Sequence, residues 1–176
     1  MKSRRRWLLA GGIALLGVLV GACCSLPSYT PSFWNGSSQV QWNNNCYNYS
    51  NNKRTDTFAQ PGRAAGSPWT ALTCPAVDVA AVADGIQRLP ASGSCPKKEC
   101  KIALVVAPGW DYHWYRLDTN GMWSHKPGGT QATSLDNSSN PIASPETADR
   151  GPYTDFCGYY CSCSSKEEGQ GRETIQ

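Results

Sequence analysis

Charged residues are scarce in this chain of 176 residues, and after the N-terminus they form no basic cluster. The chain has 16 Lys and Arg residues against 13 Asp and Glu residues. Four of the basic residues and none of the acidic ones lie in residues 1–22, so the rest of the chain has a net charge of −1. Because no positive stripe is left to contact phosphates, the sequence predicts no nucleic-acid partner.

Internal repeats and zinc-binding spacing are also missing. Cys95 and Cys100 are separated by four residues, and Cys157, Cys161 and Cys163 cluster, but no pair of Cys-x-x-Cys motifs is present. Structural zinc sites usually have such paired spacing. The sequence therefore predicts no metal site and no cofactor. The part after residue 22 is long enough for one domain with a modest core.

Residues 1–22 have the composition of an export signal. Basic residues precede an apolar stretch, 7–20, that is shorter than the roughly 20 residues of a transmembrane helix. The stretch ends in Val20-Gly21-Ala22-Cys23, which resembles a bacterial lipoprotein signal. The resemblance implies that Cys23 carries lipid, such as palmitate, and anchors the protein in the membrane of a bacterial cell envelope. The outer membrane or cell surface is favoured because no acidic residue follows Cys23. An ordinary secretory signal that is cut nearby is the alternative.

The rest of the chain divides by composition into three parts. Residues 23–42 are rich in Ser, Pro, Asn and Gly and predict a surface tether. Residues 43–163 are predicted to form a single globular domain. Residues 164–176 are polar and charged, and they predict a disordered tail.

The periodicity of the domain predicts an α+β fold. The apolar run 102–107 predicts a buried strand that ends at Pro108-Gly109, and strands over 112–118 and 122–126 follow. A helix is predicted over 75–89, with Pro75 in its first turn and Pro90 after its end. Its apolar face would carry Val79, Val82, Ala83, Ile86 and Leu89. Residues 127–156 predict a long loop over the sheet. The expected architecture is N-terminal helices packed on a small antiparallel β-sheet.

The turn between the last two strands decides whether the two histidines of the chain can meet. Asp118-Thr119-Asn120-Gly121 suits a type I turn followed by a left-handed Gly121, which forms a three-residue hairpin loop. This register places His125 opposite Tyr115, so that His113 and His125 share one face of the sheet. A two-residue turn at Asn120-Gly121 would instead put them on opposite faces. We favour the first register.

Cys46 is the candidate nucleophile. Asn45 is a good N-cap residue, and a short helix that begins near Cys46 would place its sulfur at the positive helix end and lower the pKa of the thiol. Asn48 and Ser50 are poor helix formers, so such a helix must be short or held by packing. The alternative is that Cys46 forms a disulfide.

The nine cysteines predict disulfides, because an exported protein meets an oxidising environment. If Cys23 and Cys24 belong to the anchor and Cys46 is free, six remain, and they can form three bridges in about 15 ways. These candidates are Cys74, Cys95, Cys100, Cys157, Cys161 and Cys163. Complete pairing of eight cysteines is the alternative.

The order of Cys46, His113 and His125 resembles that of the papain-like NlpC-type and CHAP cell-wall peptidases and amidases. The similar stretches are Asn45-Cys46-Tyr47-Asn48-Tyr49, Tyr112-His113-Trp114-Tyr115 and the sequence from Asn120 to His125. The resemblance covers residues 43–127 in outline and implies a papain-like fold. It implies that Cys46 attacks an amide carbonyl, that His113 transfers the proton and that His125 orients His113. The implied substrate is a peptide or amide, possibly in a cell wall.

The sequence is therefore consistent with three functions. The first is a lipid-anchored thiol hydrolase that cleaves peptide or amide bonds. The second is a non-catalytic, disulfide-stabilised binding lipoprotein with aromatic contact residues, in which Cys46 is bridged. The third is a lipoprotein that inhibits a partner enzyme. Trp110, Trp114 and Trp123 belong either to the core or to a surface that binds sugar or peptide.

Overall fold

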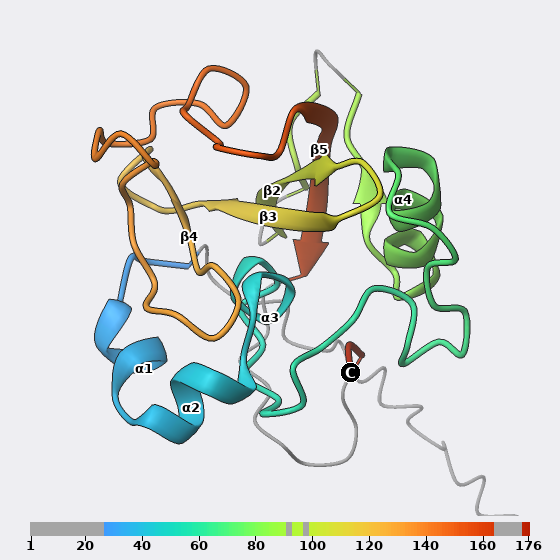
Figure 1. Cartoon of the computed structure of the whole chain (residues 1–176), viewed down its shortest axis with the longest axis horizontal. Helices are drawn as coiled ribbons and strands as arrows, with labels where there is room; N and C mark the ends of the chain where they lie inside the picture. The colour runs from blue at the N-terminus through green and yellow to red at the C-terminus, as the bar shows by residue number, and fades with distance from the viewer. Residues whose placement is uncertain (1–26, 91–92, 97–98, 164–173) are drawn as a thin grey trace, which may run out of the picture.

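The computed structural model describes residues 27–90, 93–96, 99–163 and 174–176. It contains four short helices and one antiparallel sheet of five strands (Figure 1). The helices are α1 (Pro31–Asn35), α2 (Ser38–Asn43), α3 (Cys46–Ser50) and α4 (Cys74–Ala83). The strands are β1 (Gln87–Arg88), β2 (Glu99–Ala107), β3 (Asp111–Leu117), β4 (Trp123–His125) and β5 (Asp155–Cys163), in the sheet order β1-β5-β2-β3-β4. The predicted α+β class is confirmed.

Strand β2 is apolar without interruption because both of its faces are buried. Ile102, Leu104 and Val106 pack on the side of α3 and α4. Ala103 and Val105 pack on the other side, beneath the loop that follows β4 and contributes Ile142. The prediction that residues 127–156 form a loop over the sheet is therefore confirmed for most of its length. In Figure 1 this orange loop lies near β4, away from α4.

The β3–β4 hairpin has the register that its turn residues predict. Tyr115 pairs with His125, and the Asp118 N–H donates to the Met122 carbonyl over 3.0 Å. Gly121 has a φ of 80°, the left-handed conformation that the three-residue loop requires. The alternative turn, which would separate the histidines, is excluded.

Helix α4 is shorter than the predicted helix over 75–89. It ends at Ala83, and Gly85 then takes a left-handed φ of 91°. The next residues turn away from the helix axis and join the sheet as β1. The predicted apolar face is also shifted, since Val77, Ala80 and Ala81 are buried while Val79 is exposed.

The predicted tether and tail both contain packed structure. Residues 31–43, of which all but the last lie in the predicted tether 23–42, contain α1 and α2, and Trp34 is fully buried against Tyr49. At the other end, Ile175 is buried in the main core, and the Gln60 N–H donates to the Gln176 carbonyl. The domain thus extends beyond residues 43–163 at both ends. Residues 164–173 and the signal segment, including Cys23 and Cys24, lie outside the described residues.

Two disulfides fasten segments to β5. Cys74–Cys157 links the start of α4 to this strand, and Cys95–Cys161 links it to the segment that precedes β2. Bridges that close loops of this length contribute about 2–4 kcal/mol each. Four of the six cysteine candidates are therefore confirmed. Cys100 is buried, with its sulfur 3.4 Å from the Ser162 carbonyl oxygen, and the pairing of Cys163 stays a prediction.

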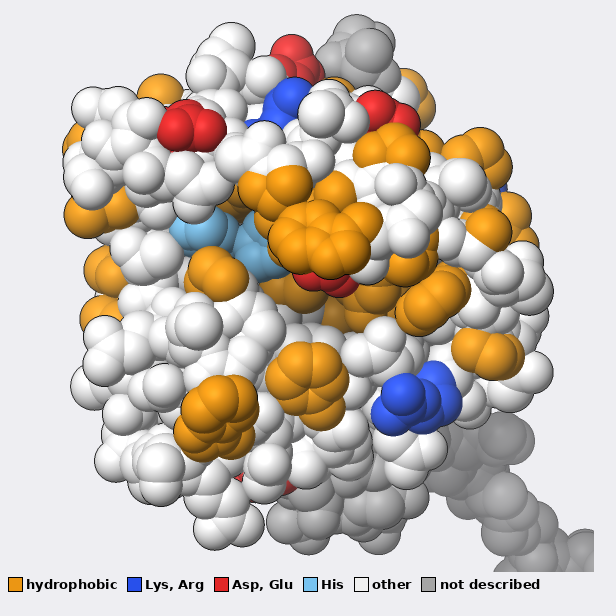
Figure 2. Space-filling model, in the orientation of Figure 1, with side chains coloured by type: hydrophobic (Ala, Val, Ile, Leu, Met, Phe, Trp, Pro, Cys, Tyr) orange, Lys and Arg blue, Asp and Glu red, His pale blue; other side chains and the backbone are white. Residues whose placement is uncertain are grey.

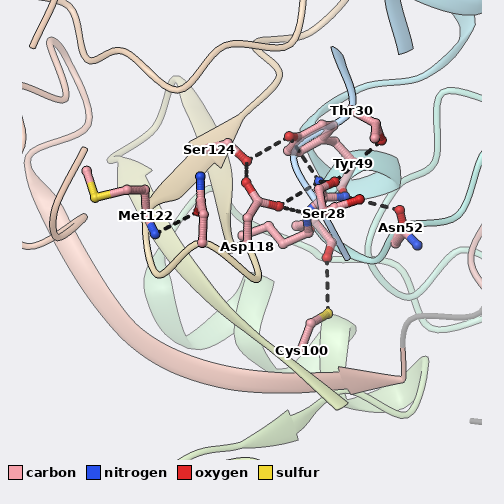
Figure 3. A network of polar contacts seen from close by, with 11 residues as sticks. Ser28, Thr30, Tyr49, Asn52, Cys100, Asp118, Met122 and Ser124 are labelled. Carbon is pink, nitrogen blue, oxygen red and sulfur yellow. Dashed lines mark hydrogen bonds and ion pairs between the residues drawn. The ribbon is translucent and has the colours of Figure 1, made fainter. Parts of the chain in front are cut away.

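The arginine of a buried ion pair within the β3–β4 hairpin also contacts α3 (Figure 3). Arg116 on β3 is fully buried and lies 2.8 Å from the Asp118 carboxylate. Its guanidinium also donates to the carbonyl of Tyr49 and to the side-chain oxygen of Asn52, each over 3.1 Å. Because the guanidinium loses water on burial, these acceptors replace the hydrogen bonds that water would have made. They fix the position of α3 on the hairpin.

Within the described part of the chain, no helix has the length and apolar character to cross a membrane.

Candidate functional site

Helix α3 begins at Cys46, as the sequence predicts. The Asn45 side chain accepts hydrogen bonds from the backbone N–H groups of Tyr47 and Asn48, and the Asn48 side chain accepts one from the N–H of Asn45. This reciprocal cap stabilises the first turn. Tyr47 and Tyr49 are fully buried, so packing holds a helix whose residues have low intrinsic helix propensity. Cys46 is a free thiol, so the alternative disulfide is excluded.

The two histidines are hydrogen-bonded to each other. Nε2 of His113 lies 2.8 Å from Nδ1 of His125. Nε2 of His125 lies 3.0 Å from the Leu135 carbonyl oxygen, which accepts and so requires a proton on that nitrogen. Nδ1 of a neutral His125 is then the acceptor, and Nε2 of His113 carries the donated proton. We assign Nδ1 of His113 as an acceptor on this basis.

Cys46 and His113 line the same cavity, which has a volume of about 280 Å³. His113 comes from β3, and His125 supports it from β4 without lining the cavity. The structure thus brings all three predicted residues together. Figure 2 shows the pale-blue histidines in a hollow flanked by orange apolar side chains.

Burial determines the protonation of these groups. It raises the pKa of the Cys46 thiol to about 12, and the Trp114 backbone N–H offsets only part of this shift. Burial, together with the neighbouring His125, holds the pKa of His113 well below its usual value. Burial also lowers the pKa of His125. The prediction of a lowered pKa for Cys46 is therefore wrong, because the field of a five-residue helix is weaker than the loss of solvation. The thiol and both imidazoles are neutral at neutral pH.

Lys126 is a buried residue near the site that the sequence did not single out. Its ammonium donates to the carbonyls of Gln41, Asn44 and Gly128. Burial lowers the pKa of Lys126 to about 8. These hydrogen bonds hold the end of α2 and the turn after β4 beside α3. Nothing in the local sequence marks this lysine as buried, since its three acceptors are backbone atoms of separate segments.

Aromatic side chains form a large part of the cavity wall. Phe58, Trp69, Tyr112 and Tyr153 line it together with Trp110. Trp110 is 64% exposed. The other two tryptophans that were candidates for a binding surface, Trp114 and Trp123, are core residues that are at most 5% exposed. Phe58 and Trp69 lie in the connection between α3 and α4, and neither residue was singled out from the sequence.

The chain is similar to a curated protein named insoluble matrix shell protein 1, from Ruditapes philippinarum. The two are 51% identical over 133 residues, which cover 74% of this chain and 86% of the relative. The chain belongs to the same family as this protein. No family model matches it, and no solved structure does.

This relationship corrects the prediction of a bacterial envelope protein. The relative is named as a shell matrix protein and not as a peptidase, an amidase or a lipoprotein. Membership of the NlpC-type and CHAP enzymes, the thiol-hydrolase function, the lipid anchor in a membrane, the cell-wall substrate and the envelope location are therefore wrong. Cys, His and His in one order along a chain are too few residues to identify a family. The catalytic assignment of Cys46, His113 and His125 stays a prediction.

Proposed function

We propose that this chain is a secreted, non-catalytic, disulfide-stabilised protein of an insoluble extracellular matrix, of the kind that the name of its relative gives as a shell matrix. The observation that carries the proposal is the 51% identity over 86% of insoluble matrix shell protein 1. An identity this high, over nearly the whole relative, supports a shared fold and a shared location.

The cysteines and the N-terminus support secretion. The disulfides Cys74–Cys157 and Cys95–Cys161 favour an oxidising compartment. Residues 1–22 then act as an ordinary secretory signal, which was the alternative to the lipoprotein signal. A matrix protein outside the cell has no need of a lipid on Cys23.

The protonation of the site supports a non-catalytic role. A cysteine nucleophile works as a thiolate, whereas burial raises the pKa of the Cys46 thiol to about 12. His113 is neutral and buried, so it forms no ion pair with the sulfur. As a finer description of the fold we infer a papain-like arrangement, with a thiol at the start of a helix that packs on a histidine-bearing strand. Its support is the joint lining of one cavity by Cys46 of α3 and His113 of β3.

Fractionation of the native protein tests the proposal. Mineralised tissue of the source organism is demineralised in dilute acid, and the residue is extracted first with detergent and then with denaturant plus reductant. We expect the protein in the acid-insoluble, detergent-resistant residue, released only by the last step. Mass spectrometry should find a mature N-terminal peptide without lipid. Recovery in the cytosol or in the detergent extract of membranes would overturn the proposal.

A further inference from the structure

The exposed aromatic side chains gather at one cavity. Trp42, Phe58 and Trp110 are the aromatic members of the large apolar residues that stay exposed in the described part of the chain, at 66%, 39% and 64% exposure. Phe58 and Trp110 line the cavity of Cys46 and His113. Trp42 lies beside its edge, because its ring packs on Gly129, next to the cavity-lining Gly128. Figure 2 shows orange side chains around the hollow. Exposure of large aromatic rings around one cavity indicates a binding site.

One wall of the cavity is flat, whereas on the other side the rings of Trp69 and Tyr112 meet edge to face at 68°. The rings of Trp110 and Tyr153 are tilted by 30° with centroids 6.2 Å apart, and the Tyr153 ring lies at 32° to that of His113. These three rings form one nearly continuous wall. Trp69 and Tyr112 form a second pair, with centroids 6.2 Å apart. Flat aromatic faces bind flat apolar faces, and the C–H face of a sugar ring is one of these.

The backbone at Phe58 is held in a conformation that presents its ring. Its φ is 52°, in the left-handed region, which a bulky residue rarely adopts. Such strain costs about 1–3 kcal/mol and persists where the surroundings impose it, often at sites that bind ligands. Here the Phe58 N–H donates to the Asn43 carbonyl over 2.6 Å, which fixes the loop against the end of α2. The strained residue is an aromatic one at the rim of the cavity.

The polar groups of the cavity accept hydrogen bonds more than they donate them. The hydroxyl of Tyr153 already donates to the Asp111 carboxylate. The hydroxyl of Tyr112 and the indole N–H of Trp69 both donate to the side-chain oxygen of Gln60. The Asp111 carboxylate accepts from the Tyr112 N–H and from Tyr153, which leaves lone pairs on both of its oxygens. A ligand rich in hydroxyl donors would satisfy these free acceptors.

The charge of the cavity excludes anionic ligands. Asp111 is a charged residue of its lining, and neither Lys nor Arg is among the described residues that line it. A phosphorylated, sulfated or carboxylated chain would meet the Asp111 carboxylate with no cation in the lining to balance it, because the Lys126 ammonium is bonded to three backbone carbonyls behind the lining. A proline-rich peptide offers carbonyl acceptors and few donors, so it does not match an acceptor-rich site either. An uncharged sugar chain matches both the rings and the acceptors.

We propose that this cavity binds an uncharged polysaccharide, with one sugar ring against Trp110 and Phe58 and its hydroxyls donating to Asp111. The volume of about 280 Å³ is near the lower end of small-ligand sites, so the cavity takes a single ring. Neighbouring sugar units of the chain would lie outside it, toward Trp42. The inference rests on the proposed matrix role for its biological meaning, since it names what the protein holds in the matrix.

Binding is measured with the secreted chain, its disulfides intact. The probes are insoluble cellulose and chitin, with cellohexaose and chitohexaose for calorimetry. Trp110→Ala and Phe58→Ala should each weaken binding about tenfold or more, as the loss of an aromatic anchor does. Asp111→Asn, which keeps the shape of the side chain, should weaken it about fivefold. Val79→Ala and Asp155→Asn replace exposed residues that do not line the cavity, and they should bind as the unmodified protein does.

Several results would overturn the inference. They are the absence of binding to either hexasaccharide at millimolar concentration, equal binding by the Trp110→Ala and unmodified proteins, and a preference for poly-L-proline or an anionic polysaccharide. Circular dichroism and the melting temperature of each variant show whether it is folded. The two proposals fail separately. A purified protein that binds no sugar, but whose native form lies in the insoluble residue, leaves the matrix role intact. Sugar binding by a protein found in the cytosol would refute the matrix role and leave the sugar-binding inference intact.

Discussion

The Cys46 thiol should react with alkylating agents far more slowly than an ordinary cysteine. Its side chain is 5% exposed, and burial raises its pKa to about 12. A cysteine with a pKa of about 8.5 is roughly 10% thiolate at pH 7.5, whereas one with a pKa of about 12 is roughly 0.003% thiolate. Because the thiolate is the nucleophile, protonation alone should slow the reaction by a factor of about 10³, and limited access should slow it further.

The assay is alkylation by iodoacetamide at pH 7.5 without reductant, followed by peptide mass spectrometry to find the labelled cysteine. Glutathione gives the rate of an exposed thiol, and the same protein in 8 M urea should label Cys46 at about that rate. His113→Ala is the informative variant. In a site of neutral groups this change should leave the rate unchanged or raise it, because it enlarges the cavity beside the sulfur.

A fast reaction would refute this reasoning. If Cys46 labels as fast as glutathione in the folded protein, and His113→Ala slows it, then His113 activates the sulfur. The predicted assignment of Cys46 as a nucleophile would then gain support, and the proposed non-catalytic role would lose its chemical argument. A rate that rises tenfold per pH unit up to pH 10 or beyond would instead confirm a thiol that stays protonated.

The remaining predictions concern stability. Replacing Cys74 and Cys157 together by Ala should lower the free energy of unfolding by about 2–4 kcal/mol in urea titrations, and an unchanged midpoint would contradict the role of that bridge. Arg116→Met leaves a buried carboxylate unpaired and should lower the free energy of unfolding by about 3–5 kcal/mol. Arg88→Met removes an exposed ion pair with Asp78 and should change this free energy little. Similar losses in the two variants would refute the distinction between buried and exposed pairs. The pKa of His113 is lowered on folding, so below pH 6.5 the unfolded chain binds more protons than the folded one, and stability should fall with decreasing pH. His113→Gln should flatten this dependence below pH 6.5, and an unaltered slope would show that other groups cause it.

Features that depend on a few neighbouring residues could be predicted from the sequence. The Asp118–Gly121 turn sets the register of its own hairpin, and that register alone brings the two histidines together. Asn45 caps the helix that begins one residue later. In both places the hydrogen bonds that decide the structure join residues close together in the sequence. The hairpin register and the helix start can therefore be predicted from the sequence.

Features that depend on distant partners could not be predicted. Residues 31–43 have the composition of a linker, but they contain two helices because Trp34 packs in a buried cluster with Tyr49 and Ala132. The aromatic lining of the cavity has the same origin, since Phe58 and Trp69 come from the connection between α3 and α4, whereas Tyr153 comes from the loop before β5. The sign of the Cys46 pKa shift was wrong for a related reason. The helix end is a local feature, but burial is set by the whole fold.

The arrangement of Cys46, His113 and His125 shows why geometry alone does not establish catalysis. The position of each residue has a purely structural explanation. A helix cap places Cys46, the strand register places His113, and a hydrogen bond to the Leu135 carbonyl orients His125. The activity of a thiol depends instead on its proton, and burial keeps that proton on the sulfur. The same burial keeps Cys46 and His113 neutral, so the exposed aromatic rings at the rim of the cavity are the groups available to contact a ligand. Trp110→Ala should therefore impair the function of this protein in the matrix more than Cys46→Ser does, provided that both variants fold. The sugar-binding assay with these two variants makes the comparison directly, and a larger loss in Cys46→Ser would place the function back at the sulfur.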